Sequence, residues 1–182
     1  MSARVALRTA TRADHERVDA LYSRFDLTRA ADYRRFLAAQ AAAHIPVEEA
    51  LDHAGASTVF PDWENRRRAE LLRRDLHETG AEPAGAMPAP NFSGLPALLG
   101  GLYVIEGSRL GGALLKRGLP AGTPARFLDA PAEPDAWRRL IAAIDTSIGA
   151  PDEIAAATSA AQAVFRLFEA AGHDVWERTD LG

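Results

Sequence analysis

One histidine stands in a pattern that could bind a metal. His15 lies in the segment TRADHERVDALY, and at helical spacing its face carries four possible partners: Arg8, Thr11, Asp19 and Tyr22. Asp19 is placed to accept a hydrogen bond from one imidazole nitrogen, which would fix the tautomer and present the other nitrogen to a metal. A solvated surface histidine is the alternative. We apply that interpretation to the other histidines, which have no clear partner pattern: His44, His53, His77 and His173.

A second pattern is a run of glycines inside an apolar, helix-like stretch, NFSGLPALLGGLYVIEGSRLGGALLKRGL. Each glycine inside a helix costs roughly 1 kcal/mol relative to alanine. Gly107 and Gly111 lie one turn apart on one face, and Gly112 is expected to widen that bare patch. Two explanations fit: close packing of two helices, or a flat ligand lying across exposed backbone. A phosphate site is rejected, because the stretch lacks the G-x-x-x-x-G-K-[ST] pattern and no strand precedes it.

Composition narrows the class of protein that these patterns serve. The 182 residues suit one domain, expected to span 1–182, and the net charge of −4 argues against nucleic-acid binding. The absence of cysteine excludes disulfides, thiolate nucleophiles, iron–sulfur clusters and covalently attached c-type haem. No apolar run suits a signal peptide or a membrane span, so we expect a cytoplasmic protein that is not bound to a membrane.

The elements that position both patterns are helices. Helical periodicity covers 7–25, a second segment that Asp32 caps and Gly55 ends, and a third from about 62 to 80. Pro46 is expected to interrupt or kink the second helix. A loop over 81–90 precedes the glycine-bearing helix, a second loop follows near 119–134, and two final helices cover about 135–148 and 151–171. Because no strand pattern or repeat occurs, we predict one all-α domain.

Together, the two patterns resemble the two signatures of haem oxygenases, especially the small bacterial enzymes associated with phytochromes. The first signature has the form L-[KR]-x-x-T-x-x-x-H-x-x-x-[DE]. Its positions are filled here by Leu7, Arg8, Thr11, His15 and Asp19. The second contains G-x-x-x-G-G, filled by Gly107, Gly111 and Gly112.

The resemblance implies a single-domain helical fold with haem between a proximal N-terminal helix and a kinked, glycine-rich distal helix. His15 would be the iron ligand, with Asp19 behind it. Four residues would contact the haem: Arg8, Thr11, Tyr103 and Arg138. The distal, catalytic side would be formed by Gly107, Ser108, Gly111 and Gly112. Ser108 stands where animal enzymes have an aspartate that organises water beside bound oxygen, whereas the small bacterial relatives tend to carry E-G-S.

The resemblance further implies that haem is both cofactor and substrate, cleaved to biliverdin, carbon monoxide and ferrous iron. No flavin or nicotinamide fingerprint is present, so electrons would come from a transient reductase or ferredoxin. A phytochrome is a possible acceptor of biliverdin, and a monomer is expected. The first alternative is a haem carrier on the same fold without turnover. A thiamin-degrading or di-iron relative is disfavoured, because the chain has no cysteine and no paired Glu/His ligands. The third alternative is a helical interaction module that binds no ligand.

Overall fold

The computed structural model describes residues 2–131 and 134–178, and over these ranges the chain is helical without a strand. The predicted all-α class is therefore confirmed. The long helices are α1 (Ala3–Tyr22), α2 (Ala30–His53), α6 (Gly94–Lys116) and α9 (Pro151–Glu177). Shorter ones are α5 (Ala69–Thr79) and α8 (Pro134–Ser147), with the single turns α3 (Ala56–Val59), α4 (Trp63–Arg66) and α7 (Arg126–Asp129). No helix in this part of the chain combines the length and apolarity that crossing a membrane requires.

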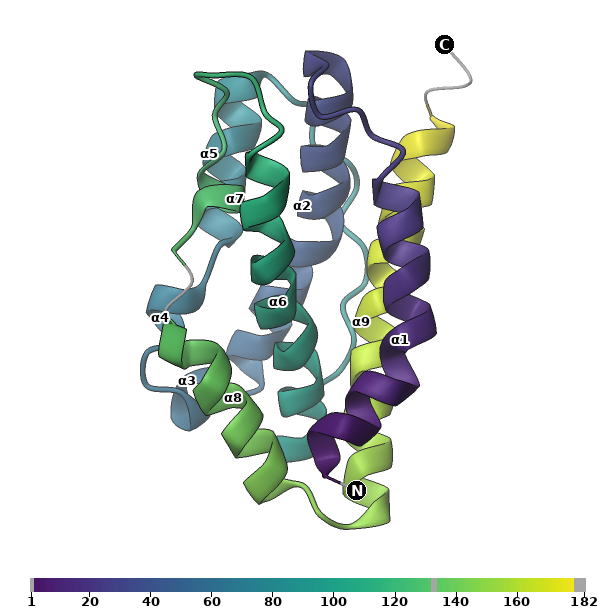
Figure 1. Ribbon diagram of the computed structural model, residues 1–182, viewed down its shortest axis with the longest axis vertical. Coiled ribbons are helices and arrows are strands. Elements are labelled where there is room, and N and C mark those ends of the chain that lie inside the picture. Colours follow the sequence, from purple (N-terminus) through teal and green to yellow (C-terminus); the bar gives the residue numbers. More distant parts are fainter. Residues whose placement is uncertain (1, 132–133, 179–182) are drawn as a thin grey trace.

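The last long helix is the centre of the packing. α9 packs against α1, α2 and α6, whereas α1 and α6 have few direct contacts with each other. Figure 1 shows α1 and α6 side by side and running in the same direction, with α9 behind α1. The two helices that carry the predicted site are thus held side by side through a shared third helix.

Most predicted helix boundaries lie close to the observed ones. Gly55 and Gly80 end their helices with left-handed backbone, at φ angles of +86° and +65°. The prediction that Asp32 caps the second helix is wrong: Arg29 is the N-cap, and Asp32 pairs with Arg35 at 2.9 Å inside the first turn. Pro46 lies within α2 and does not end it.

The third predicted helix is divided into α4 and α5, with Arg67 extended and Arg68 between the two helices. A buried carboxylate from α2 accounts for the division. Glu48 accepts hydrogen bonds from the backbone N–H of Arg68 at 2.7 Å and of Ala69 at 2.8 Å. A negative charge at a helix N-terminus satisfies free N–H groups and the helix dipole. Glu48 therefore fixes where α5 begins, which a local sequence pattern does not reveal.

Candidate functional site

The N-terminal helix presents an exposed imidazole whose orientation is set by a neighbouring carboxylate. His15 Nδ1 lies 3.0 Å from Asp19 Oδ2, and the His15 side chain is 61% exposed. The ring also meets Phe165 of α9 in an edge-on contact with the centroids 5.8 Å apart. The predicted contact between His15 and Asp19 is present. With the Nδ1 hydrogen held by Asp19, the lone pair of Nε2 is available to a metal.

Two residues before His15 on α1, Thr11 at one turn and Arg8 at two turns, interact with Tyr103 of α6. The Thr11 hydroxyl and the Arg8 charge both act on Tyr103: burial raises the pKa of the Tyr103 phenol, and these two neighbours oppose the rise. Because α1 and α6 run in the same direction (Figure 1), one further turn leads from Thr11 to His15 and from Tyr103 to Gly107. His15 and Gly107 therefore occupy corresponding positions on the two helices.

Thr11 itself is 2% exposed, and its hydroxyl donates to the Leu7 carbonyl at 2.8 Å. This buried location suits Thr11 to positioning Tyr103 rather than to contacting a ligand directly. Arg8 is exposed and has no carboxylate within ion-pair distance among the described residues. It is therefore available to a ligand's acidic group.

The glycines of α6 divide into two groups. Gly100, Gly107 and Gly111 lie on nearly the same face, because eleven residues make almost exactly three turns. A methyl group on Gly100 would overlap the carbonyl oxygen of Ala157 in α9. A methyl on Gly111 would meet no atom of the described residues within 4 Å, whereas one on Gly107 would make ordinary contact with the Trp137 ring at 3.6 Å. The face of α6 that carries these three glycines is thus packed against α9 at Gly100 and open at Gly111.

Gly112 lies on a different side of α6. A methyl there would be 3.5 Å from the Leu128 carbonyl oxygen of α7, and Gly112 is buried. The bare patch is therefore formed by Gly107 and Gly111, because one residue of helix turns the direction by about 100°.

The open part of this face is apolar. Leu110 is 55% exposed and Leu114 is 67% exposed. Leu110 follows Gly107 by three residues and Leu114 follows Gly111 by three, so both leucines border the glycine stripe on the same side. Large apolar side chains gathered at an open surface usually mark a binding site. The stripe suits a flat, apolar ligand.

Arg138 lies on α8, where it pairs with Asp135. It lines a surface hollow together with Arg4 and Trp137. The Trp137 ring packs against Tyr103 with the centroids 5.6 Å apart. Arg138 therefore adjoins the candidate site through Trp137, and among the described residues no hydrogen bond or ion pair joins it to α1 or α6.

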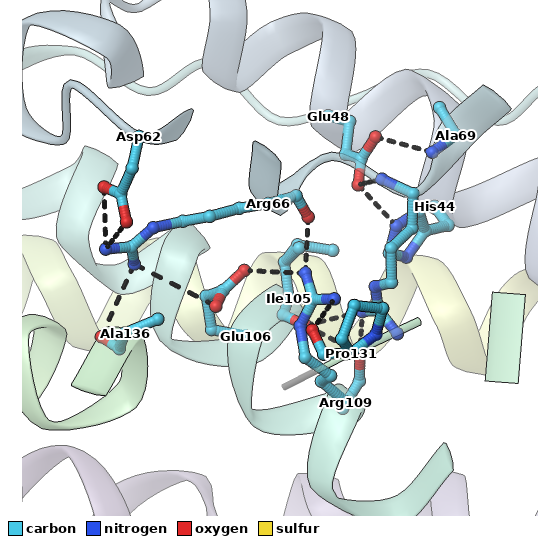
Figure 2. A network of polar contacts seen from close by, with 12 residues as sticks. His44, Glu48, Asp62, Arg66, Ala69, Ile105, Glu106, Arg109, Pro131 and Ala136 are labelled. Carbon is cyan, nitrogen blue, oxygen red and sulfur yellow. Dashed lines mark hydrogen bonds and ion pairs between the residues drawn. The ribbon is translucent and has the colours of Figure 1, made fainter. Parts of the chain in front are cut away.

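A buried polar network that the sequence patterns did not indicate reaches α6 from α2 and α4 (Figure 2). His44 is completely buried and its Nε2 is 2.8 Å from Glu48 Oε1, so the interpretation of His44 as a solvated histidine is wrong. Burial lowers the pKa of His44, which makes the neutral ring the stable form. Burial alone would raise the pKa of Glu48, but the His44 ring and the backbone amides of α5 lower it to about 2. The only indication of this buried pair in the sequence was that Glu48 follows His44 by four residues, which makes the two side chains neighbours on one helix face.

Three arginines belong to the same network, in contact with α6. Arg66 pairs with Asp62 at 3.0 Å, and Arg109 pairs with Glu106 at 3.3 Å. Arg68 donates to the hydroxyl of Ser108 at 2.7 Å. Ser108, predicted as a distal residue, is therefore tied to a buried cation.

An imidazole opposite an apolar helix face without side chains is an arrangement that suits a planar iron macrocycle. The haem oxygenase of Xanthomonas campestris pv. campestris (strain 8004) is 36% identical to this chain over 127 residues, 66% of this chain and 76% of that protein. No family model matches the chain. The similarity to the Xanthomonas protein nevertheless shows that the chain belongs to the haem oxygenase family, which consists of enzymes.

Solved structures agree with this assignment. The haem oxygenase from Neisseria meningitidis, determined with NO and CO bound, matches with a TM-score of 0.81 and 25% identity, covering 97% of this chain and 93% of that one. Haem oxygenase from Leptospira interrogans matches with a TM-score of 0.73 at 18% identity, over 96% of this chain and all of the other (100%). The second similarity concerns the fold alone.

Proposed function

We propose that this protein, as a single domain, binds haem between α1 and α6 and cleaves it with O2 and external electrons to biliverdin, carbon monoxide and ferrous iron. One observation carries the proposal. His15, held by Asp19 at 3.0 Å, occupies the position on α1 that corresponds to the open glycine face of α6. The membership of the haem oxygenase family supports the same conclusion.

The residues present fit haem as a substrate. The free Nε2 of His15 is a suitable axial ligand for iron, and Asp19 would strengthen it by holding the opposite ring nitrogen. The bare backbone at Gly111 allows a flat ring to approach the helix, since even a methyl there would have open space around it. Leu110 and Leu114 would cover the ring's apolar surface.

The edge of the site favours an acidic group. Arg8 lies two turns before His15, about 10 Å along the helix axis. Its guanidinium has no carboxylate partner in the described part of the chain and could pair with a propionate. Tyr103, which the Arg8 charge affects, would support this edge, with Arg138 further out on α8.

Haem supplies the iron at which O2 is reduced, and its own ring is the group that is cleaved. The chain's own residues hold the ring, exclude bulk water and fix polar groups on the distal side. Gly111 would leave no side chain between the ring and the helix, and at Gly107 the Trp137 ring would border the ligand. Ser108 stands beside them with its hydroxyl already hydrogen-bonded, so it would order water rather than act as an acid.

Electrons would come from a transient ferredoxin or reductase. The arginines near this edge, Arg4, Arg8 and Arg138, would suit an acidic donor. A phytochrome is a suitable acceptor of biliverdin, and we propose that the protein acts as a monomer.

The test is a titration of the purified protein with one equivalent of hemin, followed under air with a reductase–ferredoxin pair or ascorbate. We expect a sharp Soret band that decays into the broad red absorption of biliverdin. A stable Soret band with every donor would instead indicate a haem carrier. An absorption spectrum identical to that of free hemin would refute haem binding altogether.

A further inference from the structure

Arg68 is a buried cation that contacts the distal helix directly. Its residue is 1% exposed, and its Nη2 donates to the Ile105 carbonyl at 2.8 Å and to the Ser108 hydroxyl at 2.7 Å. These two acceptors flank Gly107 in the sequence. One guanidinium nitrogen is therefore bound to both ends of the short segment that includes Gly107.

The position of Arg68 is fixed from several sides. Its backbone N–H is held by Glu48, and its guanidinium lies over the Phe127 ring, 4.8 Å from the centroid. Burial, and then the nearby Arg109 charge, lower the pKa of Arg68 to about 10, so it stays protonated at neutral pH. Burying a charge without a paired carboxylate is costly in free energy, and such groups are often found at functional sites.

Arg68 differs from the other two buried arginines of the network. Arg66 and Arg109 each form an ion pair with a carboxylate. Among the described residues, the guanidinium of Arg68 has no carboxylate within 4.0 Å, and its partners are a carbonyl, a hydroxyl and an aromatic ring. Its positive charge is thus less fully compensated, and it lies against the distal helix.

The Ser108 hydroxyl is oriented by these contacts. It donates its hydrogen to the Ile105 carbonyl at 2.7 Å and accepts from Arg68. One lone pair of the oxygen remains. Ser108 is therefore an acceptor toward its exposed side, with its hydrogen already used.

We propose that Arg68 is a positioning residue of the haem oxygenase reaction, which holds the Ile105–Ser108 segment and places a fixed positive charge beside the distal face. This inference rests on the proposed function, because it needs haem bound at that face. A fixed positive charge near developing negative charge costs no reorganisation during the reaction. It would stabilise electron density that accumulates on the diatomic ligand of the haem.

The experiment measures the C–O stretching frequency of the ferrous haem complex with CO. The variants are Arg68→Met, which removes the charge, and Arg68→Lys, which keeps it without the planar fork. Arg67→Met is the matched control, because Arg67 is the neighbouring residue but pairs instead with Asp52 at 3.1 Å. Urea unfolding of each haem-free variant measures the structural effect separately.

We expect Arg68→Met to shift the C–O stretch to higher wavenumber, because a positive charge draws electron density onto the ligand. The C–O stretch of Arg68→Lys should stay near the wild-type frequency, even if this variant loses as much stability as Arg68→Met. The C–O stretch of Arg67→Met should equal that of the wild type. An unshifted Arg68→Met, or equal shifts in the Lys and Met variants, would show that Arg68 is only structural and would overturn the proposal.

Ser108→Ala keeps the proposal testable if Arg68→Met does not fold, since it removes only one hydroxyl at the helix surface. The C–O stretch of Ser108→Ala should differ from that of the wild type, because the guanidinium of Arg68 then loses one of the two α6 acceptors that hold it. An unchanged frequency would refute the coupling between Arg68 and the distal face. A wild-type protein that binds no haem refutes the proposed function and this inference together, whereas haem binding with insensitive variants refutes only the latter.

Discussion

Replacing Gly111 by alanine should stabilise the haem-free protein and at the same time weaken haem binding. Gly111 lies inside α6, its φ is not positive, and an added methyl would meet no atom within 4 Å in the part of the chain that the structure describes. Alanine is better than glycine inside a helix by about 1 kcal/mol, partly because it restricts the unfolded chain. In a protein of this size that gain raises Tm by about 2–4 °C.

The same methyl should disturb a flat ring resting on the helix. Forcing one extra carbon into a close contact costs typically about 1–3 kcal/mol. Because 1.4 kcal/mol corresponds to a tenfold change, the dissociation constant for haem should rise roughly 5- to 150-fold. Stability and affinity are thus expected to change in opposite directions, which a purely structural glycine would not produce.

Gly100→Ala is the matched control, since Gly100 lies on nearly the same face of the same helix. Its methyl would overlap the Ala157 carbonyl oxygen, and a backbone atom has little freedom to move. This variant should lose at least about 1–3 kcal/mol of stability. Calorimetry of the haem-free proteins and a Soret titration measure both effects. Destabilisation by both alanines, or unchanged haem affinity in Gly111→Ala, would refute the assignment of the open face.

Three further predictions follow from the site and the buried network. The His15→Ala variant should fold, because the His15 side chain is exposed. It should lack the Soret band and the electron paramagnetic resonance spectrum of histidine-ligated ferric haem. His173→Ala, which changes another exposed histidine, is the control, and unchanged spectra in His15→Ala would contradict the assignment of the iron ligand. Gly107→Leu should keep its helical circular dichroism but lose haem or O2 binding, and wild-type binding would return Gly107 to a packing role. The pKa of Glu48 is lowered from 4.5 to about 2, so the stability that its carboxylate contributes is present above pH 4.5 and is lost as the pH falls toward 2. Urea unfolding between pH 7 and 3 should show a steeper acid loss in the wild type than in Glu48→Gln, and parallel curves would refute the lowered pKa.

Local patterns were enough to predict the helical class and the contact between His15 and Asp19. Both depend on spacing within one helix, where residues four apart are neighbours. The helix ends at Gly55 and Gly80 were also predictable, because a glycine that follows the last helical residue commonly ends a helix with left-handed backbone. The candidate iron ligand and its carboxylate partner are therefore local features.

The buried network was not predictable, because its contacts join segments far apart in the sequence. The run Arg66, Arg67, Arg68 has the composition of a solvated helix face, yet Arg68 is almost fully buried and reaches Ser108 forty residues away. His44 appeared as one more surface histidine. Only the packing of α2 and α5 against α6 and α7 brings His44, Glu48 and Arg68 together.

The glycine stretch shows why two explanations of one pattern can both hold. Gly100 and Gly111 share a helix face but not a neighbour, because α9 covers that face at Ala157 and leaves it open further along. Close approach at Gly100 brings α6 onto α9, the helix that also carries α1. Had a larger residue stood at Gly100, α6 would lie further from α9, and the distance between His15 and the open glycines would change with it. The packing glycine thus helps to set the width of the space that the open glycines line.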